Sequence, residues 1–317
     1  MTKLIQVLFH GNCFDGCCSA VLFTRFQKQM DDQATFSYVP CYHVKGADYR
    51  DQLEPEATTA VVDFGFVAGA DWWFDHHKSG LKAEDQALYE AQKGERFFYD
   101  PKRGSCTKFI ADIARDHFGV EFPELSDLVN WAEKCDFALF ADAAEATDLT
   151  HPAKVIEAVV GATKNRDLLV TVIERLQTET LATVAALPEI QAEFGPLRER
   201  HKAFFDLFRD RGQTTGGVYF ADFMTPGDDI DGYNKFIPYS LFPDTYNSVL
   251  LAAKKGSPKI YLGRNPWGTG RNLADLSALA EEFGGGGHPW AAALSLPAGE
   301  EEKAFRIYQE IIERLHG

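Results

Sequence analysis

The sequence has few cysteines, no long apolar run and a shortage of positive charge. Its six cysteines are irregularly spaced over 317 residues, with Cys17 and Cys18 adjacent. This usage argues against a disulfide framework and favours a reducing compartment. No apolar run approaches the ~20 residues that span a bilayer. The N-terminus also lacks a basic region before an apolar stretch with a small-residue cleavage site. We therefore expect a cytoplasmic protein that makes no use of a membrane.

Positive charge is scarce, with 32 Lys and Arg residues against 47 Asp and Glu residues and a formal net charge of −15. Proteins that bind long nucleic acids through the phosphates normally present a basic surface. The charge therefore argues against a binder of long duplexes and leaves small phosphorylated substrates open.

The cysteines fit neither of two common kinds of cysteine site. A cysteine-dependent phosphatase needs a thiolate beside an arginine-bearing anion loop. No cysteine here has an arginine six positions later, and Arg25 follows Cys18 one position too late. The spacing of Cys13, Cys17 and Cys18 near His10 matches no usual structural zinc site. We therefore set both functions aside.

The first half of the chain alternates short apolar runs with helix-like segments. This alternation predicts βαβ units and a mainly parallel sheet. The expected strands are residues 4–9, 35–42 and 59–62, and the expected helices are residues 17–30, 83–94, 105–118 and 125–135.

The length suggests two domains at ~150 residues per domain. From Pro152 to about Arg211 the pattern is almost wholly helical, and strand-like runs return from Gly216 onward. We expect an α/β protein with a doubly wound, mainly parallel N-terminal sheet and a smaller C-terminal α/β domain. The expected limits are 1–187 for the first domain, 188–212 for a connecting helix and 213–317 for the second domain.

Three apolar runs lead directly into acidic or imidazole side chains. One ends at His10, one at Asp63 and one at the cluster Asp75-His76-His77. Because the carboxyl ends of parallel strands meet at one edge of the sheet, these side chains should lie together. Two adjacent histidines at a strand end seldom fill a core, since successive strand residues point to opposite faces. Carboxylates with neutral imidazoles suit an ion such as Mn²⁺. The pattern therefore predicts a metal site.

The same elements, in this order, resemble the DHH phosphoesterases. Their pattern includes the Asp75-His76-His77 triplet, an upstream Asp63 and an N-terminal loop that contains His10 and an aspartate. The Gly285–His288 segment is similar to the fingerprint of their companion DHHA1 domain. The resemblance covers nearly the whole chain. It implies manganese-dependent hydrolysis of phosphodiester or phosphoanhydride bonds, with one or two ions and with Mg²⁺ or Co²⁺ as alternatives.

The resemblance also implies a role for each matching residue. Asp63 would bridge two metals and His10 would hold one of them. Asp15, His76 and Asp136 would hold the other. Asp75 would orient the histidines that follow it, and His77 would contact the scissile phosphate. In the family loop two aspartates are spaced by one residue, and here Cys13 stands at the first of these positions. A neutral thiol is a poor ligand for Mn²⁺.

Substrate-binding residues are expected in both domains. Four glycines before His288 remove every side chain, so that backbone N–H groups can approach an anion closely. By resemblance, Gly286, Gly287 and His288 would bind the far phosphate or sugar of the substrate, with Arg264 as a phosphate contact. Arg103, near the start of an expected helix, would meet a phosphate at the helix N-terminus.

The expected function is hydrolysis of phosphodiester bonds in small nucleotides, with catalytic residues His77 and Asp75. Candidate substrates are short oligonucleotides, cyclic or linear dinucleotides and 3′,5′-bisphosphate nucleotides. Two alternatives stay open: a pyrophosphatase or exopolyphosphatase acting on phosphoanhydrides, and a degenerate nucleotide sensor, which Cys13 would explain. Homodimers are common among relatives, so the resemblance leaves a homodimer open.

Overall fold

The computed structural model describes residues 3–44, 47–268 and 274–316. By internal packing the chain divides into two compact units. Unit 1 is Met1–Leu139 with Leu149–Leu197, and unit 2 is Phe140–Asp148 with Arg198–Gly317. Within the described residues, no helix has both the length and the apolar character needed to cross a membrane.

Unit 1 is built on a five-stranded sheet in which every strand pair is parallel. The strand order β2-β1-β3-β4-β5 is an order found in doubly wound α/β folds. The predicted α/β class with a parallel N-terminal sheet is therefore confirmed. The strands are β1 (Leu4–His10), β2 (Thr35–Cys41), β3 (Thr58–Val62), β4 (Trp72–Asp75) and β5 (Phe97–Tyr99).

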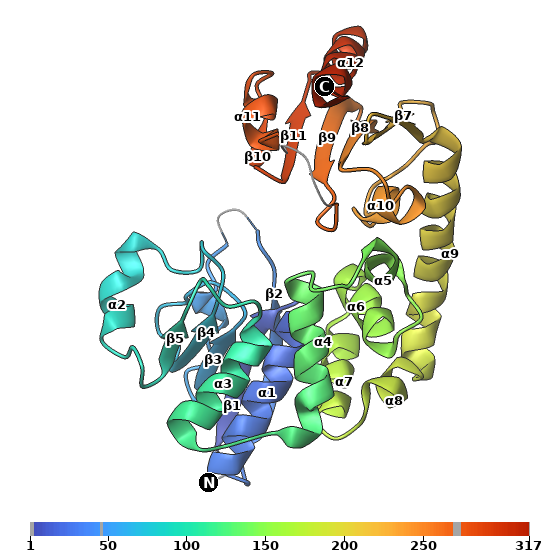
Figure 1. Cartoon of the computed structure of the whole chain (residues 1–317). Helices are drawn as coiled ribbons and strands as arrows, with labels where there is room; N and C mark the ends of the chain where they lie inside the picture. Colours follow the sequence, from blue (N-terminus) through green and yellow to red (C-terminus); the bar gives the residue numbers. More distant parts are fainter. Residues whose placement is uncertain (1–2, 45–46, 269–273, 317) are drawn as a thin grey trace. The chain divides into compact units, whose positions relative to one another are not determined.

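Both faces of this sheet are covered, which explains why its strands are continuous apolar runs. Ile5, Val7 and Phe9 of β1 point into the larger core beneath the helices, whereas Leu8 belongs to a smaller core on the opposite face. The helices α1 and α3 lie across the sheet in Figure 1. The larger core is shared by α1 (Phe14–Met30), α3 (Cys106–Phe118), α4 (Ser126–Asp136), α6 (Pro152–Ala162), α7 (Arg166–Leu176) and α8 (Leu181–Ala185).

Two local expectations differ from the structure. The helix expected over 83–94 is only α2 (Gln86–Glu90), preceded by a 3-10 turn at Ala83–Asp85. Tyr89 is its one buried residue and Leu88 is 51% exposed, so this segment has little apolar surface to stabilise a longer helix. Strand β5 was not predicted, because its three residues are too few to show a pattern. The other 3-10 turns are Arg50–Gln52 and Pro123–Leu125.

The long helix expected between the strand-rich regions is α9 (Pro188–Arg211). The division between the units falls within it, after Leu197. The expected limits at residues 187 and 212 are the ends of the connecting helix, whereas the two units are defined by their internal contacts. The expected limits therefore stay predictions.

A short segment from the first half of the chain packs in unit 2. This segment, Phe140–Asp148, contains α5 (Ala143–Thr147). The indole Nε1 of Trp267 donates to the Phe140 carbonyl at 2.7 Å, and Asn234 Nδ2 donates to the Ala146 carbonyl at 3.0 Å. Side chains of unit 2 thus donate hydrogen bonds to backbone carbonyls of this segment. The order of residues along the chain gives no means of predicting these contacts.

Unit 2 contains a six-stranded mixed sheet of order β10-β11-β9-β8-β7-β6. Only β7 and β8 pair in parallel; the other pairs are antiparallel. Helices α11 (Leu276–Glu281) and α12 (Glu301–His316) cover one face, and the C-terminal half of α9 with α10 (Ile237–Leu241) covers the other. The strands are β6 (Gln213–Thr215), β7 (Val218–Phe223), β8 (Asn247–Lys254), β9 (Ser257–Arg264), β10 (Gly286–His288) and β11 (Ala291–Ser295).

Candidate metal centre

Acidic, imidazole and thiol side chains converge at the carboxyl edge of the parallel sheet. His10 ends β1, Asp63 follows β3, and His76 and His77 follow β4. Two helix ends complete the group, because Cys13 is the N-cap of α1 and Asp136 is the last residue of α4. All of the residues predicted to hold metals therefore lie together. They form three overlapping sets of potential ligands: His10 with Cys13 and Asp63; Asp63 with His76 and His77; and Asp15 with His76 and Asp136.

Asp63 is the residue that joins the two sides of this group. It is fully buried, with Oδ2 3.5 Å from His10 Nδ1 and Oδ1 3.3 Å from His76 Nε2. Neither carboxylate oxygen has a hydrogen-bond partner among the described residues. Its backbone is left-handed, with φ 55°, a conformation that aspartate tolerates better than most residues but that still costs about 1 kcal/mol. Strain and two unpaired buried oxygens at one residue indicate a site that binds something absent from the protein alone.

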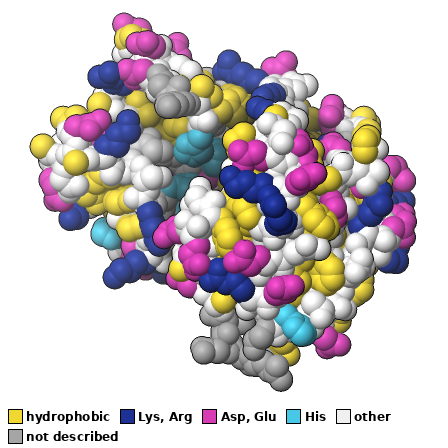
Figure 2. Space-filling view, turned by 90° about the horizontal axis from the view of Figure 1, so that it is seen from above, with side chains coloured by type: hydrophobic (Ala, Val, Ile, Leu, Met, Phe, Trp, Pro, Cys, Tyr) yellow, Lys and Arg dark blue, Asp and Glu magenta, His cyan; other side chains and the backbone are white. Residues whose placement is uncertain are grey.

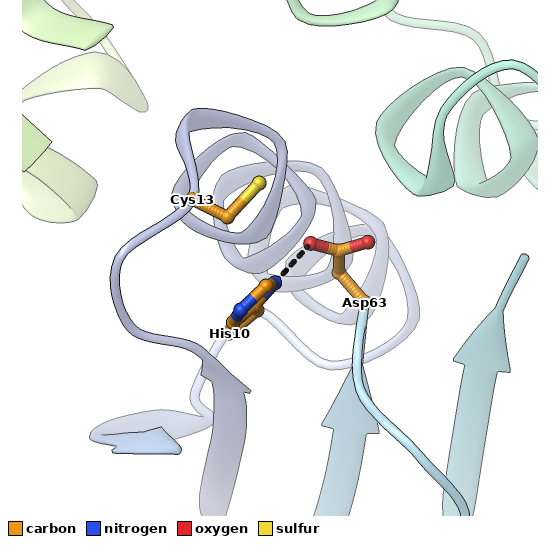
Figure 3. A group of neighbouring side chains, drawn as sticks. All are labelled: His10, Cys13 and Asp63. Atoms are coloured by element: carbon orange, nitrogen blue, oxygen red, sulfur yellow. Dashed lines mark ion pairs between the residues drawn. The ribbon is translucent and has the colours of Figure 1, made fainter. Parts of the chain in front are cut away.

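The first side of the centre consists of His10, Cys13 and Asp63. One potential ligand atom from each lies within 4.8 Å of the others. In Figure 3 the His10 ring faces Asp63 along the dashed line, and the Cys13 sulfur lies over the same space from the start of α1. His10 Nδ1 has no hydrogen-bond partner among the described atoms.

The second side consists of Asp15, His76 and Asp136. His76 Nε2 is 3.8 Å from Asp15 Oδ2 and 3.4 Å from Asp136 Oδ2. The other ring nitrogen, Nδ1, lies 3.1 Å from the backbone carbonyl of Arg103. A carbonyl only accepts, so Nδ1 carries a proton, and Nε2 is the nitrogen that can give up its proton and bind an ion among the acidic groups. Metal-binding histidines are commonly fixed in this way.

Asp15 is positioned by the N-terminus of α3. Its Oδ2 accepts the Cys106 N–H at 2.6 Å and its Oδ1 accepts the Thr107 N–H at 3.1 Å. Unpaired amides and a positive dipole end make a helix N-terminus a natural partner for a carboxylate. Because Asp15 takes these amides, the anion that α3 binds at this end is one of the protein's own side chains.

Asp75 supports both histidines of the triplet. Its buried Oδ1 accepts the backbone N–H groups of His76, at 2.8 Å, and of His77, at 3.2 Å, and lies 2.7 Å from His77 Nδ1. The side chain of His77 is 32% exposed, and its pKa is raised chiefly by this contact with Asp75. Asp75 therefore holds His77 through Nδ1 and leaves Nε2 for another partner.

The protonation equilibria reflect an excess of acidic groups in a small volume. Burial and the charges of Asp63 and Asp136 raise the pKa of Asp15 well above its usual range. Burial and the charge of Asp63 raise the pKa of Asp136 to about 6. Burial by itself lowers the pKa of His76, but the surrounding carboxylates outweigh this effect and raise the pKa to about 10. A divalent cation would relieve this repulsion, so the donor set and its electrostatics fit a metal centre.

Sequence reasoning missed one histidine at the site. The sequence pattern does not single out His43, but its ring lies edge-on to His10 at 4.8 Å and stacks on Phe64 at 4.8 Å. Its centroid is 6.3 Å from that of His77. The sequence did contain a signal, because His43 comes two residues after β2, the strand that pairs with β1, and His10 ends β1.

Most of the predicted substrate-binding residues lie in unit 2. His288 is exposed in β10 and stacks on Trp290, with centroids 5.3 Å apart. Arg264, at the end of β9, donates its backbone N–H to the Trp290 carbonyl, and its Nη2 donates to the Ala274 carbonyl. Arg264 in β9 and His288 in β10 thus lie on the two sides of β11 in the same sheet. Arg103 instead lies in unit 1, where its guanidinium pairs with Asp112 at 2.8 Å. Phosphate binding by these residues stays a prediction.

Three of the four glycines before His288 have structural explanations. Gly284 has φ 80° and follows α11, where a left-handed residue ends the helix. A Cβ at Gly285 would come within 2.5 Å of the Ala293 carbonyl oxygen, and a Cβ at Gly287 would meet the backbone of β11 equally closely. Gly286 has neither constraint, because no atom lies within 4 Å of an added Cβ and its φ is not positive. Since no protein contact requires a glycine at position 286, the approach of a ligand is the best explanation for it.

The fold is shared with known phosphoesterase structures. No protein-family model matches the sequence, and a search of curated proteins found no match. Among solved structures, the pGpG-specific phosphodiesterase PggH from Vibrio cholerae is similar with a TM-score of 0.73 and 18% identity, over 99% of this chain and 100% of that one. An exopolyphosphatase-related protein from Bacteroides fragilis is similar with a TM-score of 0.55 and 14% identity, over 99% and 92%.

RecJ from Thermus thermophilus, in a complex with Mn²⁺, is similar with a TM-score of 0.56 and 13% identity, over 98% of this chain and 52% of RecJ. At these identities the likeness concerns the fold. It covers both units and agrees with the expectation drawn from the motifs. The chain has the fold of these structures, a parallel α/β unit and a unit with a mixed sheet, which is the fold that the resemblance to the DHH phosphoesterases implies.

Proposed function

We propose that this protein is a metal-dependent phosphodiesterase that hydrolyses short nucleotides. The observation that carries the proposal is the buried Asp63, whose two unpaired oxygens face His10 on one side and His76 on the other. A carboxylate placed in this way suits a bridge between two divalent ions. When bound, such ions polarise phosphoryl oxygens and supply a hydroxide at neutral pH.

The chain's own residues divide the remaining work. His10 and Cys13 with Asp63 would hold one ion, and Asp15, His76 and Asp136 with Asp63 would hold the other. The Arg103 carbonyl keeps the proton of His76 on Nδ1, so that Nε2 stays available as a ligand.

His77 would contact the scissile phosphate. Asp75 accepts its Nδ1 proton, so Nε2 is the nitrogen that remains for a phosphate oxygen. Asp75 then acts through His77 as a positioning residue, without touching the substrate.

A dinucleotide with one phosphodiester bond is the first substrate to test. The pGpG-specific phosphodiesterase shares the fold over the full length of both chains, which makes a linear dinucleotide such as pGpG the leading candidate. Acidic and basic side chains are interspersed over the face seen in Figure 2. Together with the net charge of −15, this pattern disfavours a long nucleic-acid duplex as partner and is compatible with a short nucleotide.

Mn²⁺ is the ion proposed for the carboxylate-rich side, with Mg²⁺ and Co²⁺ as alternatives. Imidazole and carboxylate ligands suit ions of intermediate hardness. The proposed setting is a cytoplasmic one, in agreement with the sparse, unpaired cysteines.

A substrate panel tests the proposal. Metal-stripped protein should hydrolyse pGpG or another dinucleotide once Mn²⁺ is restored, and release mononucleotides. Faster release of phosphate from pyrophosphate or polyphosphate would instead support a phosphoanhydride hydrolase. Binding of the dinucleotide without cleavage by any of the three ions would identify a sensor and contradict the proposal.

A further inference from the structure

The two sides of the metal centre offer different kinds of donor atom. Asp15, His76 and Asp136 supply oxygen and nitrogen, whereas His10, Cys13 and Asp63 supply nitrogen, sulfur and oxygen. Thiolates select thiophilic ions such as Zn²⁺, and carboxylates suit Mn²⁺ or Mg²⁺. We propose that the His10–Cys13–Asp63 side is a thiolate site for an ion of the zinc class, so that the centre holds two unlike ions. This inference rests on the proposed function, because it assigns the ion of one side of the same centre.

Cys13 has no structural task that explains its sulfur. It is the N-cap residue of α1, a position where Ser, Thr, Asp or Asn normally accepts a backbone N–H. Its side chain makes no such capping bond. Its sulfur lies 3.9 Å from Asp136 Oδ1, at the outer limit for a hydrogen bond to sulfur, and near the Gly16 backbone N–H. Neither contact prevents the sulfur from binding an ion.

The neighbours of Cys13 form a set typical of a catalytic zinc site. Such sites use three protein ligands drawn from Cys, His and Asp or Glu, with water in the fourth position. Ligands at about 2.0–2.3 Å from one tetrahedral ion stand roughly 3.4 Å apart. The His10 Nδ1 to Asp63 Oδ2 distance of 3.5 Å agrees with this spacing. Both atoms are buried without hydrogen-bond partners in the described part of the chain.

The charges around Cys13 favour a cation. Cys13 is half-buried and lies among the carboxylates of Asp63, Asp15 and Asp136, whose charge an ion would balance. Its sulfur would add a strong bond to zinc at about 2.3 Å.

Cobalt spectroscopy of the full chain tests this inference without any activity measurement. Metal-stripped protein is loaded with Co²⁺, whose bond to a thiolate produces a charge-transfer band in the near ultraviolet. We expect the band in the wild type, its loss in C13S and C13D, and its retention in C17S. Cys17 is the matched control, because it lies one turn further along α1, fully buried, and belongs to none of the ligand groups. X-ray absorption of the zinc form should show one sulfur at about 2.3 Å.

The ion preferences should change in the same direction. C13D should weaken Zn²⁺ binding at this side by at least about tenfold, the scale on which even the partners of metal ligands act, and should strengthen Mn²⁺ binding. Bound Co²⁺ without a sulfur band in the wild type, or with a band that survives in C13S, would overturn the inference and leave the proposed function intact. A wild-type chain that binds no Co²⁺ at all would contradict the metal centre itself, and with it the proposed function. Circular dichroism checks that each variant is folded.

Discussion

The rim of the parallel sheet in unit 1 and the glycine-rich strand of unit 2 were both expected to be functional, yet the structure constrains them differently. At the rim, both buried oxygens of Asp63 lack a hydrogen-bond partner among the described residues, and Asp63 has a left-handed backbone. In unit 2 the loop is exposed, and most of its glycines serve the helix end and the strand pairing. Without bound ions the rim of unit 1 lowers the stability of the fold. The glycine-rich segment of unit 2 forms a β-hairpin that needs no ligand to be stable. The case for function is therefore much stronger at the rim.

Substitution of Asp63 should lower activity more than any other change considered. An unchanged activity would mean that the rim of unit 1 is no more functional than the glycine-rich segment of unit 2. Asparagine tolerates the same left-handed backbone, so D63N should fold while losing the bridging charge. We expect dinucleotide hydrolysis with Mn²⁺ to fall by at least about a hundredfold, because a shared ligand matters more than a ligand's partner. The control is D116N, which changes an exposed carboxylate of unit 1 that pairs with Arg115. Equal rates for D63N and the wild type would exclude the bridging role.

A glycine beside Asp75 offers a test of the support for His77. A Cβ at Gly80 would overlap Asp75 Oδ2, whereas a Cβ at the nearby Gly65 would meet nothing closer than the Gly80 carbonyl oxygen at 3.5 Å. G80A should therefore displace Asp75 and lower kcat by about 10–100-fold, and G65A should leave it close to the wild-type value. Steady-state kinetics with a dinucleotide compares the two. A G80A rate equal to that of G65A would mean that the placement of Asp75 does not matter.

Substitutions at two adjacent glycines test whether the glycine-rich segment of unit 2 serves the fold or the substrate. G285A should destabilise the fold by about 1–3 kcal/mol, because its Cβ would press on β11. G286A should leave the melting temperature unchanged and raise KM several-fold if the backbone there approaches the substrate. Thermal melts and substrate titrations separate these effects. An unchanged KM in G286A would reduce the loop to a structural element.

The smallest effect is expected at His43. Its ring contacts those of His10 and Phe64, and it forms no ion pair with another described residue. H43A should lower activity by less than about tenfold, since it removes packing and no hydrogen bond. H117A is the control, because the ring of His117 packs on Phe98 and not on a ligand. Equal activities of the two variants would show that His43 does not help to orient His10.

The sequence was sufficient to predict a parallel sheet, though not its strand β5, and to predict which side chains meet at its carboxyl edge. Buried parallel strands are continuous apolar runs, and their polar ends meet at one edge, so His10, Asp63 and His76 could be brought together without coordinates. The same rule applied to β2 would have found His43. The Arg103 carbonyl that fixes His76 could not be predicted, since a backbone atom leaves no trace in residue type. Nor could the packing of Phe140–Asp148 in unit 2, which depends on hydrogen bonds to distant side chains.

The most direct test of the account is the number of divalent ions bound per chain. Metal-stripped wild type and D63N should be equilibrated with Mn²⁺ and Zn²⁺ together, dialysed and measured by elemental analysis. The account predicts two ions per wild-type chain and loss of both from D63N, because Asp63 is a ligand on both sides of the centre. A wild-type chain that binds no ion, or a D63N chain that keeps both, would contradict it.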